Sequence, residues 1–316
     1  MRIVVFLCLC FSLAATAGEN DKAIERELFV FHASTTQFIE PIESALLDAR
    51  VKLIEILHDS LSYKPDIYMS DNLADFKKLI GTAFPDWGAA AALPYRSMIA
   101  LKSPANFPLG KPLRELVMHE YAHLALSDRI RPMNAPRWLD EGVAMYTAAE
   151  WGWQNNLSMG RAALFGEFIS LYEIEDLNRF SEGQASVAYA QSYLAVKYLL
   201  DNYGPESFNI LLDGIKSRRP IDDALTDAIG GTYREFEKEF NLFLNDRYNW
   251  GSIFMDTYFL WIFLALVVFI GFMLQRRKKQ KYYKKWAEDE KYQSTDFDYG
   301  DPDNPEKEDD EDKPWA

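Results

Sequence analysis

Cysteine is almost absent from this chain, and its absence narrows the chemistry available. The two cysteines among 316 residues, Cys8 and Cys10, lie in an apolar stretch that follows Met1-Arg2 and precedes Ala15-Thr16-Ala17. A positive start, an apolar run and small residues predict a signal peptide over residues 1–17, and a retained N-terminal anchor is the alternative. After cleavage no cysteine would remain. Disulfides and thiolate ligands would then be excluded, and a metal would have to be held by histidines and carboxylates.

Basic residues are fewer than acidic residues in this chain. The chain has 34 Lys and Arg against 48 Asp and Glu, a net charge of −14. Nucleic-acid binding requires a basic surface, so we expect no nucleic-acid partner. The composition is 48% hydrophobic, which is sufficient for a packed core in one large or two modest domains.

One long apolar run lies near the C-terminus. Residues 258–274 contain no charged side chain, and Thr257 extends the run. Eighteen helical residues reach ~27 Å, close to the ~30 Å hydrocarbon core of a bilayer. We therefore predict a transmembrane helix over residues 257–274; a buried core helix is the alternative.

The charges that follow this run predict its orientation. Lysines and arginines crowd residues 276–285, and such clusters favour the cytoplasmic side. We expect a single-pass membrane protein with an extracytoplasmic domain over residues 18–250, periplasmic if the host is Gram-negative. Residues 275–316, basic and then acidic, form a cytoplasmic tail with a disordered end. A docking segment for a cytoplasmic partner is the alternative for that tail.

Periodicity predicts an α+β domain. Short strands are expected at residues 66–70 and 97–101, and residues 84–94 have a turn- and alanine-rich composition. Apolar residues at three- and four-residue steps predict helices over residues 37–61, 73–80, 112–126, 137–150 and 186–203. Strands come early and helices come late, which favours a small sheet followed by a helical C-terminal lobe.

A short motif on one predicted helix carries the chemistry. His119-Glu120-Tyr121-Ala122-His123 has the HExxH pattern. Four residues make about one helical turn, so both imidazoles project from one face and can reach a single Zn²⁺. Glu120 then lies beside the metal as a general base, without being a ligand itself. The other histidines, His32 and His58, are isolated in apolar segments and are expected to be structural.

A third ligand is available in Trp138-Leu139-Asp140-Glu141-Gly142 at the start of the next helix. A third histidine six residues after His123 is excluded, because that position is Arg129. Glu141, eighteen residues after His123, would complete a site of two histidines and one carboxylate with a fourth position left for water. Asp140 is the neighbouring alternative; its shorter side chain is better placed to cap the helix.

HEYAH followed by WLDEG resembles the gluzincin metallopeptidases, in particular the peptidase MA-like group related to the M1 aminopeptidases. The resemblance covers about residues 28–247 and implies a zincin-like fold, one zinc per chain and Glu141 as its third ligand. The spacing to Glu141 is one residue shorter than is usual in M1 enzymes, and their glycine-rich exopeptidase motif is not evident. Aminopeptidase activity is therefore not carried over.

The resemblance also implies two substrate-binding features. Related enzymes use a tyrosine to stabilise the oxyanion, and Tyr189 is the candidate, with Tyr193 one turn later as the runner-up. Aromatic core packing is the alternative for both. The predicted strand at residues 97–101 resembles the edge strand that pairs with the peptide backbone in zincins, and an ordinary core strand is its alternative.

Together these features predict a membrane-anchored zinc metallopeptidase that acts on an extracytoplasmic peptide or protein substrate. A non-catalytic zinc-binding or scaffold protein of the cell envelope is the alternative, although a structural site has no use for Glu120. Hydrolysis of a non-peptide amide or ester is a third reading that no residue excludes.

Overall fold

The computed structural model describes residues 22–81, 88–248 and 257–292. The predicted signal peptide and the acidic end of the tail, residues 293–316, lie outside the described residues. The chain divides into two compact units, residues 1–251 and 252–316, and each is described by itself.

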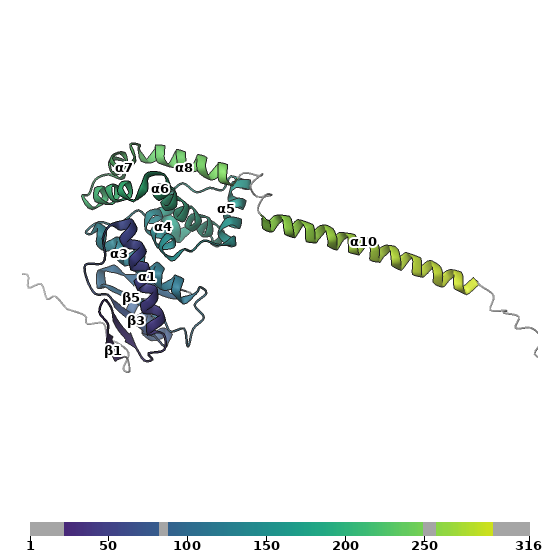
Figure 1. Cartoon of the computed structure of the whole chain (residues 1–316), viewed down its shortest axis with the longest axis horizontal. Helices are drawn as coiled ribbons and strands as arrows, with labels where there is room; N and C mark the ends of the chain where they lie inside the picture. Colours follow the sequence, from purple (N-terminus) through teal and green to yellow (C-terminus); the bar gives the residue numbers. More distant parts are fainter. Residues whose placement is uncertain (1–21, 82–87, 249–256, 293–316) are drawn as a thin grey trace, which may run out of the picture. The chain divides into compact units, whose positions relative to one another are not determined.

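A five-stranded mixed sheet forms one layer of the first unit (Figure 1). Its strands are β1 (Lys22–Glu25), β2 (Val30–Ala33), β3 (Asp66–Ser70), β4 (Ala90–Leu93) and β5 (Met98–Lys102), in the order β1-β2-β3-β5-β4. The middle pairs are parallel, and the outer strands β1 and β4 pair antiparallel with their neighbours. All five residues of β5 are buried, as expected for a strand inside a sheet.

Helices make up most of this unit. Helices α1 (Ile39–Leu57) and α2 (Leu73–Ile80) alternate with the strands, and α3 (Leu113–Ile130), α4 (Arg137–Ala148) and α5 (Trp153–Phe165) follow them. The last helices are α6 (Glu182–Lys216), α7 (Ile221–Ile229) and α8 (Tyr233–Arg247). The mixed α+β architecture with late helices is thus confirmed. The predicted helix end at Gly204 is instead a kink, since Gly204 has non-helical angles but α6 resumes at Pro205.

One prediction about the sheet is wrong. The strand at residues 97–101 is β5 and lies between β3 and β4, so its resemblance to an edge strand does not hold and its alternative, an ordinary core strand, does. The edge strand next to β5 is β4, in the segment with the turn- and alanine-rich composition. Alanine has a low intrinsic preference for strands, and β4 forms through its pairing with β5, which a local pattern does not reveal.

Helix α4 lies very close to α6. A Cβ atom at Gly142 would be 2.3 Å from the carbonyl oxygen of Ser192 and 2.5 Å from a methyl group of Val196. Only glycine allows this approach. The contact fixes α4, which carries the WLDEG residues, against the part of α6 that carries Tyr189.

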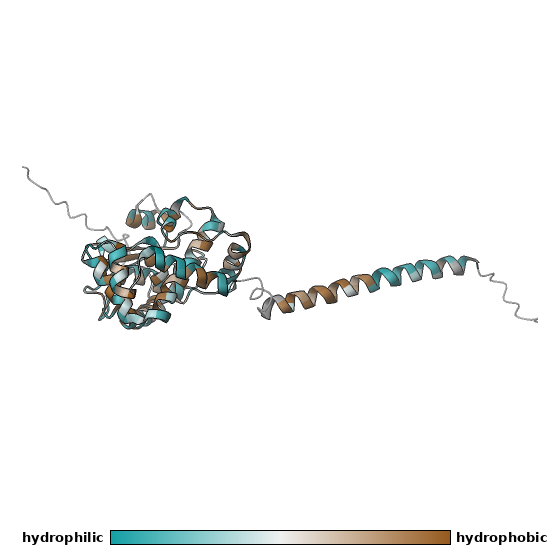
Figure 2. Cartoon of the chain, turned by 90° about the horizontal axis from the view of Figure 1, so that it is seen from above, coloured by the Kyte–Doolittle hydropathy of each residue, from teal (hydrophilic) through white to brown (hydrophobic). Residues whose placement is uncertain are grey.

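The second unit is one helix, α10 (Thr257–Tyr292). Figure 2 shows that its first half is hydrophobic and its second half hydrophilic. Among the described residues, it is the one helix long and apolar enough to cross a membrane. Helix α10 continues beyond residues 257–274, the predicted transmembrane span, since residues 275–292 contain good helix formers and neither glycine nor proline.

Candidate metal centre

The two histidines of the HExxH motif lie on one side of α3, facing α4. The His119 and His123 rings are 4.9 Å apart between centroids. Glu141, in the second turn of α4, is 3% exposed and directs Oε2 to within 3.6 Å of His119 Nε2 and 3.9 Å of His123 Nε2. The structure therefore brings together all three residues expected to be ligands. Among the described residues, they form one group of donors within 4.8 Å of one another.

A further carboxylate faces the other nitrogen of each ring. Asp140 Oδ1 lies 2.8 Å from His123 Nδ1, and Glu150 Oε1 lies 2.9 Å from His119 Nδ1. Carboxylates in these positions favour a proton on Nδ1 and leave Nε2 with its lone pair toward a metal. Asp140, considered above as an alternative ligand, thus lies on the outer side of His123.

Sequence reasoning missed Glu150. It follows the end of α4, where Ala149 adopts a left-handed conformation with φ of 55° and turns the chain back toward α3. The Glu150 side chain is 8% exposed, and Oε2 accepts a hydrogen bond from Lys111 Nζ at 2.6 Å. A left-handed alanine has no reliable sequence signature, so helical spacing could not identify this residue.

Arg137 also belongs to this cluster. Its Nη2 atom is 2.8 Å from Oε1 of Glu141, the oxygen not directed at the histidines. The i, i+4 spacing of this pair on α4 is a signal from which sequence reasoning could have found it. The arginine holds the Glu141 carboxylate in one orientation, so Oε2 remains toward the rings.

The two candidate tyrosines have different surroundings. Tyr189 on α6 accepts a hydrogen bond from Arg137. Burial raises the pKa of Tyr189, and Glu141 lies close enough for the negative charge of its carboxylate to raise that pKa further. Tyr193 instead stacks on Trp151, with ring centroids 4.7 Å apart, and also packs near Tyr146. The structure brings Tyr189 to the metal-ligand cluster and gives Tyr193 a packing role.

Glu120 connects α3 to the edge of the sheet. It is 9% exposed, and its Oε2 accepts a hydrogen bond from the backbone N–H of Ala92 in β4 at 2.7 Å. Glu120 therefore contacts the edge strand β4 and not β5.

Buried charges set the protonation of the cluster. Burial lowers the pKa of His119, but the neighbouring carboxylates of Glu141 and Glu150 outweigh it and raise the pKa to about 10. Burial raises the pKa of Glu141, but His119, His123 and Arg137 outweigh it and lower the pKa to about 2. Opposite charges have to be paired in a buried site, and here the acids require cations.

The remaining histidines lie outside this cluster. His32 Nε2 is 2.7 Å from Asp66 Oδ1, and its ring stacks on Tyr68. His58 ends α1 in a left-handed conformation, and its half-exposed ring lies 3.9 Å from the exposed carboxylate of Glu206. The surroundings of His32 fit the expected structural role, whereas His58 lies at the surface.

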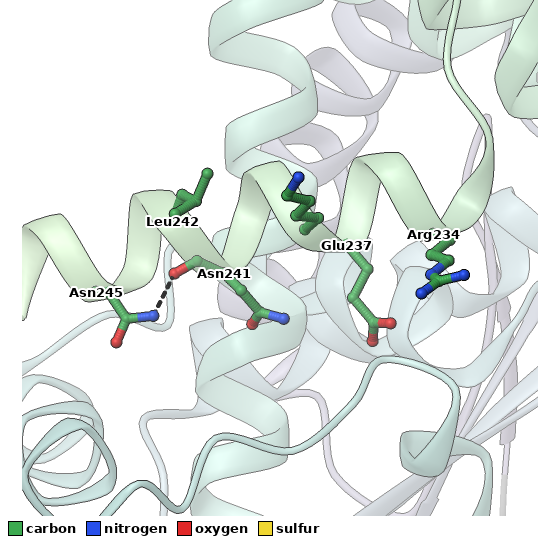
Figure 3. Close-up of a pocket in the computed structure, with 6 residues that line it drawn as sticks. Arg234, Glu237, Asn241, Leu242 and Asn245 are labelled. Atoms are coloured by element: carbon green, nitrogen blue, oxygen red, sulfur yellow. Dashed lines mark hydrogen bonds between the residues drawn. The ribbon is translucent and has the colours of Figure 1, made fainter.

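A hollow of about 390 Å³ along α8 has a structural explanation (Figure 3). It is lined by Arg234, Glu237, Lys238, Asn241, Leu242 and Asn245. Glu237 Oε1 accepts hydrogen bonds from the Ser170 hydroxyl and the Leu171 N–H, both at 2.7 Å, so the carboxylate serves to hold that loop.

The donor set fits a zinc ion. Nitrogen and oxygen ligands at ~2.0–2.1 Å in tetrahedral geometry lie ~3.4 Å from one another. The separations of 3.6 and 3.9 Å between the Glu141 oxygen and the two histidine nitrogens are close to that value. Two imidazoles and one carboxylate also leave a fourth position for water.

Comparison with known families supports the motif reading. A family model described as the Peptidase MA superfamily matches residues 45–246, more than half of the chain. This range contains the HEYAH and WLDEG segments that carried the resemblance, and the resemblance to the peptidase MA-like group is confirmed. No curated protein matches the chain.

Proposed function

This chain belongs to the peptidase MA superfamily, and we propose that it is a zinc metallopeptidase anchored in a membrane by α10. The observation that carries this proposal is the convergence of His119, His123 and Glu141, with Glu120 beside them. A structural zinc site is usually closed by four protein ligands, whereas this group supplies three and places a further carboxylate next to them.

Each of these residues would have a defined task. When bound, zinc would polarise the scissile carbonyl and lower the pKa of a water toward about 7. Glu120 would accept a proton from the attacking water and pass it to the leaving amine. Its hydrogen bond from Ala92 N–H fixes the carboxylate and leaves the second oxygen for the proton.

Tyr189 is the proposed donor to the oxyanion. Burial, and secondarily the charge of Glu141, raise the pKa of Tyr189 to about 12. The phenol therefore remains protonated at neutral pH and can donate a hydrogen bond to the developing negative oxygen. Arg137 donates to the same phenol oxygen and so directs its proton away from the guanidinium.

The substrate would bind as an extended peptide. Strand β4 pairs with β5 on one side, and no described strand pairs with its other side. Backbone groups on that side, next to Glu120, can pair with a peptide in a way that depends little on sequence. By the positive-inside rule we place this domain on the extracytoplasmic side, with the tail free to recruit a cytoplasmic partner.

Glu120→Gln tests the proposal. The full chain, purified in detergent and loaded with zinc, is assayed on a mixture of internally quenched peptides. The variant should retain its zinc and lose at least ~100-fold in kcat, because the general base is gone. A chelator should remove the wild-type activity and added zinc restore it. Full activity in the variant would refute the general-base role, and no metal-dependent cleavage by the wild type would refute the peptidase assignment.

A further inference from the structure

Helix α5 exposes an unusual set of large apolar side chains. Trp153, Leu157 and Phe165 are 66, 49 and 70% exposed. They are spaced by four and eight residues, which places them within about 120° of one another around the helix. The opposite side of α5 packs into the core through Met159 and Ala162. The outer face of α5, meaning Trp153, Leu157 and Phe165 with the exposed Gln154 and Arg161, therefore carries three large apolar side chains that are open to solvent in the described residues.

Charge around this face differs from charge in the rest of the chain. Residues 151–166 contain no acidic residue and one basic residue, Arg161, which is exposed between Leu157 and Phe165. The whole chain carries a net charge of −14. A tryptophan, two further large apolar residues and an arginine on one face, without acids, are typical of helices that lie in the interface of a bilayer.

The chain between α5 and α10 includes one short connection. The hydroxyl of Tyr248, which follows α8, is 3.5 Å from Oδ1 of Asn156 on α5, and Figure 1 shows α5 beside the end of α8. Eight residues, 249–256, connect Tyr248 to α10. A chain of eight residues spans at most ~29 Å, which limits how far Tyr248, the residue that contacts α5, can lie from the start of α10.

We propose that the outer face of α5 docks on the surface of the bilayer in which α10 is anchored. Trp153 and Leu157 enter the boundary between headgroups and acyl chains, and Arg161 binds lipid phosphates. This inference rests on the proposed membrane insertion of α10. A soluble protein partner would also cover an apolar face, but the short connection to α10 favours lipid, because lipid is always within reach.

Docking would place the metal centre near the membrane surface. Glu150, whose carboxylate contacts His119, precedes Trp153 by three residues. Three residues of chain reach ~10 Å. The substrates expected of such a centre are peptide segments close to the membrane, as in the juxtamembrane parts of membrane-anchored proteins.

A fluorescent label on α5 tests the docking. Cys8 and Cys10 are changed to Ala in the full chain, and single cysteines are introduced by Gln154→Cys, Val51→Cys or Val267→Cys. Gln154 lies on the outer face of α5, Val51 is 58% exposed on α1, and Val267 lies in the apolar half of α10. Each variant is labelled with nitrobenzoxadiazole and reconstituted in phosphatidylethanolamine–phosphatidylglycerol vesicles, with doxyl-labelled lipid or aqueous iodide as quencher.

We expect doxyl lipid to reduce the emission of the label at residue 154 by at least ~2-fold, with little effect at residue 51. Trp153→Ser with Leu157→Ser should abolish the lipid quenching at residue 154. Quenching at 267 but not at 154 would overturn the docking and leave the anchor intact, whereas quenching at neither would overturn both. A label at 154 shielded from both quenchers would indicate a protein partner and also overturn the docking, as would lipid quenching that survives the double substitution.

Discussion

The metal centre and the outer face of α5 depart from ordinary protein composition in opposite ways. At the metal centre, Glu120 and Glu141 are buried at 9 and 3% exposure, whereas on α5 Trp153 and Phe165 are mostly exposed. Buried acids require cations, and exposed apolar patches require apolar contacts. The composition of each region fits the partner proposed for it: a metal ion in the first case and a lipid surface in the second.

Of the substitutions that test this comparison, removal of the third ligand should have the largest effect, and the effect is on zinc affinity. Glu141→Ala eliminates one of three protein donors and removes the carboxylate that pairs with Arg137. We expect zinc affinity to fall by at least about 1,000-fold, because two imidazoles remain. Metal analysis after dialysis against a weak chelator measures the loss. Glu55→Ala, which removes an exposed carboxylate from α1, is the control and should retain zinc.

Zinc binding by Glu141→Ala at the wild-type level would mean that another oxygen donor, such as Asp140, takes its place. The assignment of Glu141 as the third ligand would then be wrong.

The next effect concerns the core beneath the site. Trp138, in the first turn of α4, is fully buried and lies 5.9 Å from Phe236 between ring centroids. Trp138→Ala should lower the free energy of unfolding by ~3–5 kcal/mol, because the fold cannot fill the space that the indole leaves. Urea denaturation of the full chain in detergent measures this. A loss below about 1 kcal/mol would contradict the packing described here.

A substitution at Glu150 tests whether the carboxylate opposite His119 Nδ1 contributes to metal affinity. Glu150→Gln keeps the size of the side chain but removes the charge opposite His119 Nδ1. Removal of such outer carboxylates typically lowers metal affinity by ~10–100-fold. Competition with a fluorescent zinc chelator measures the affinity, with Glu55→Gln as the matched control. If both variants bind zinc like the wild type, Glu150 serves only to hold Lys111.

The same contrast explains which features could be predicted from sequence. The strand at residues 66–70 and the helix at residues 73–80 have the predicted bounds, because each depends on a local pattern. His119, Glu120 and His123 also follow from helical spacing alone. Strand β4 depends on a partner distant in sequence, and Glu150 depends on the left-handed turn at Ala149. Neither leaves a local pattern, so the structure was needed to find them.

The smallest effect on the free energy of unfolding should come from substitution of the exposed Trp153 on α5. Trp153→Ser should change the free energy of unfolding in detergent by no more than about 0.5 kcal/mol, because the indole of Trp153 is 66% exposed whereas that of Trp138 is fully buried. The same urea titration serves both variants, so the two tryptophans are a matched pair. A loss of several kcal/mol at Trp153 would mean that the outer face of α5 is packed within the fold. The contrast between the two regions would then disappear, and with it the reason to assign this face to lipid.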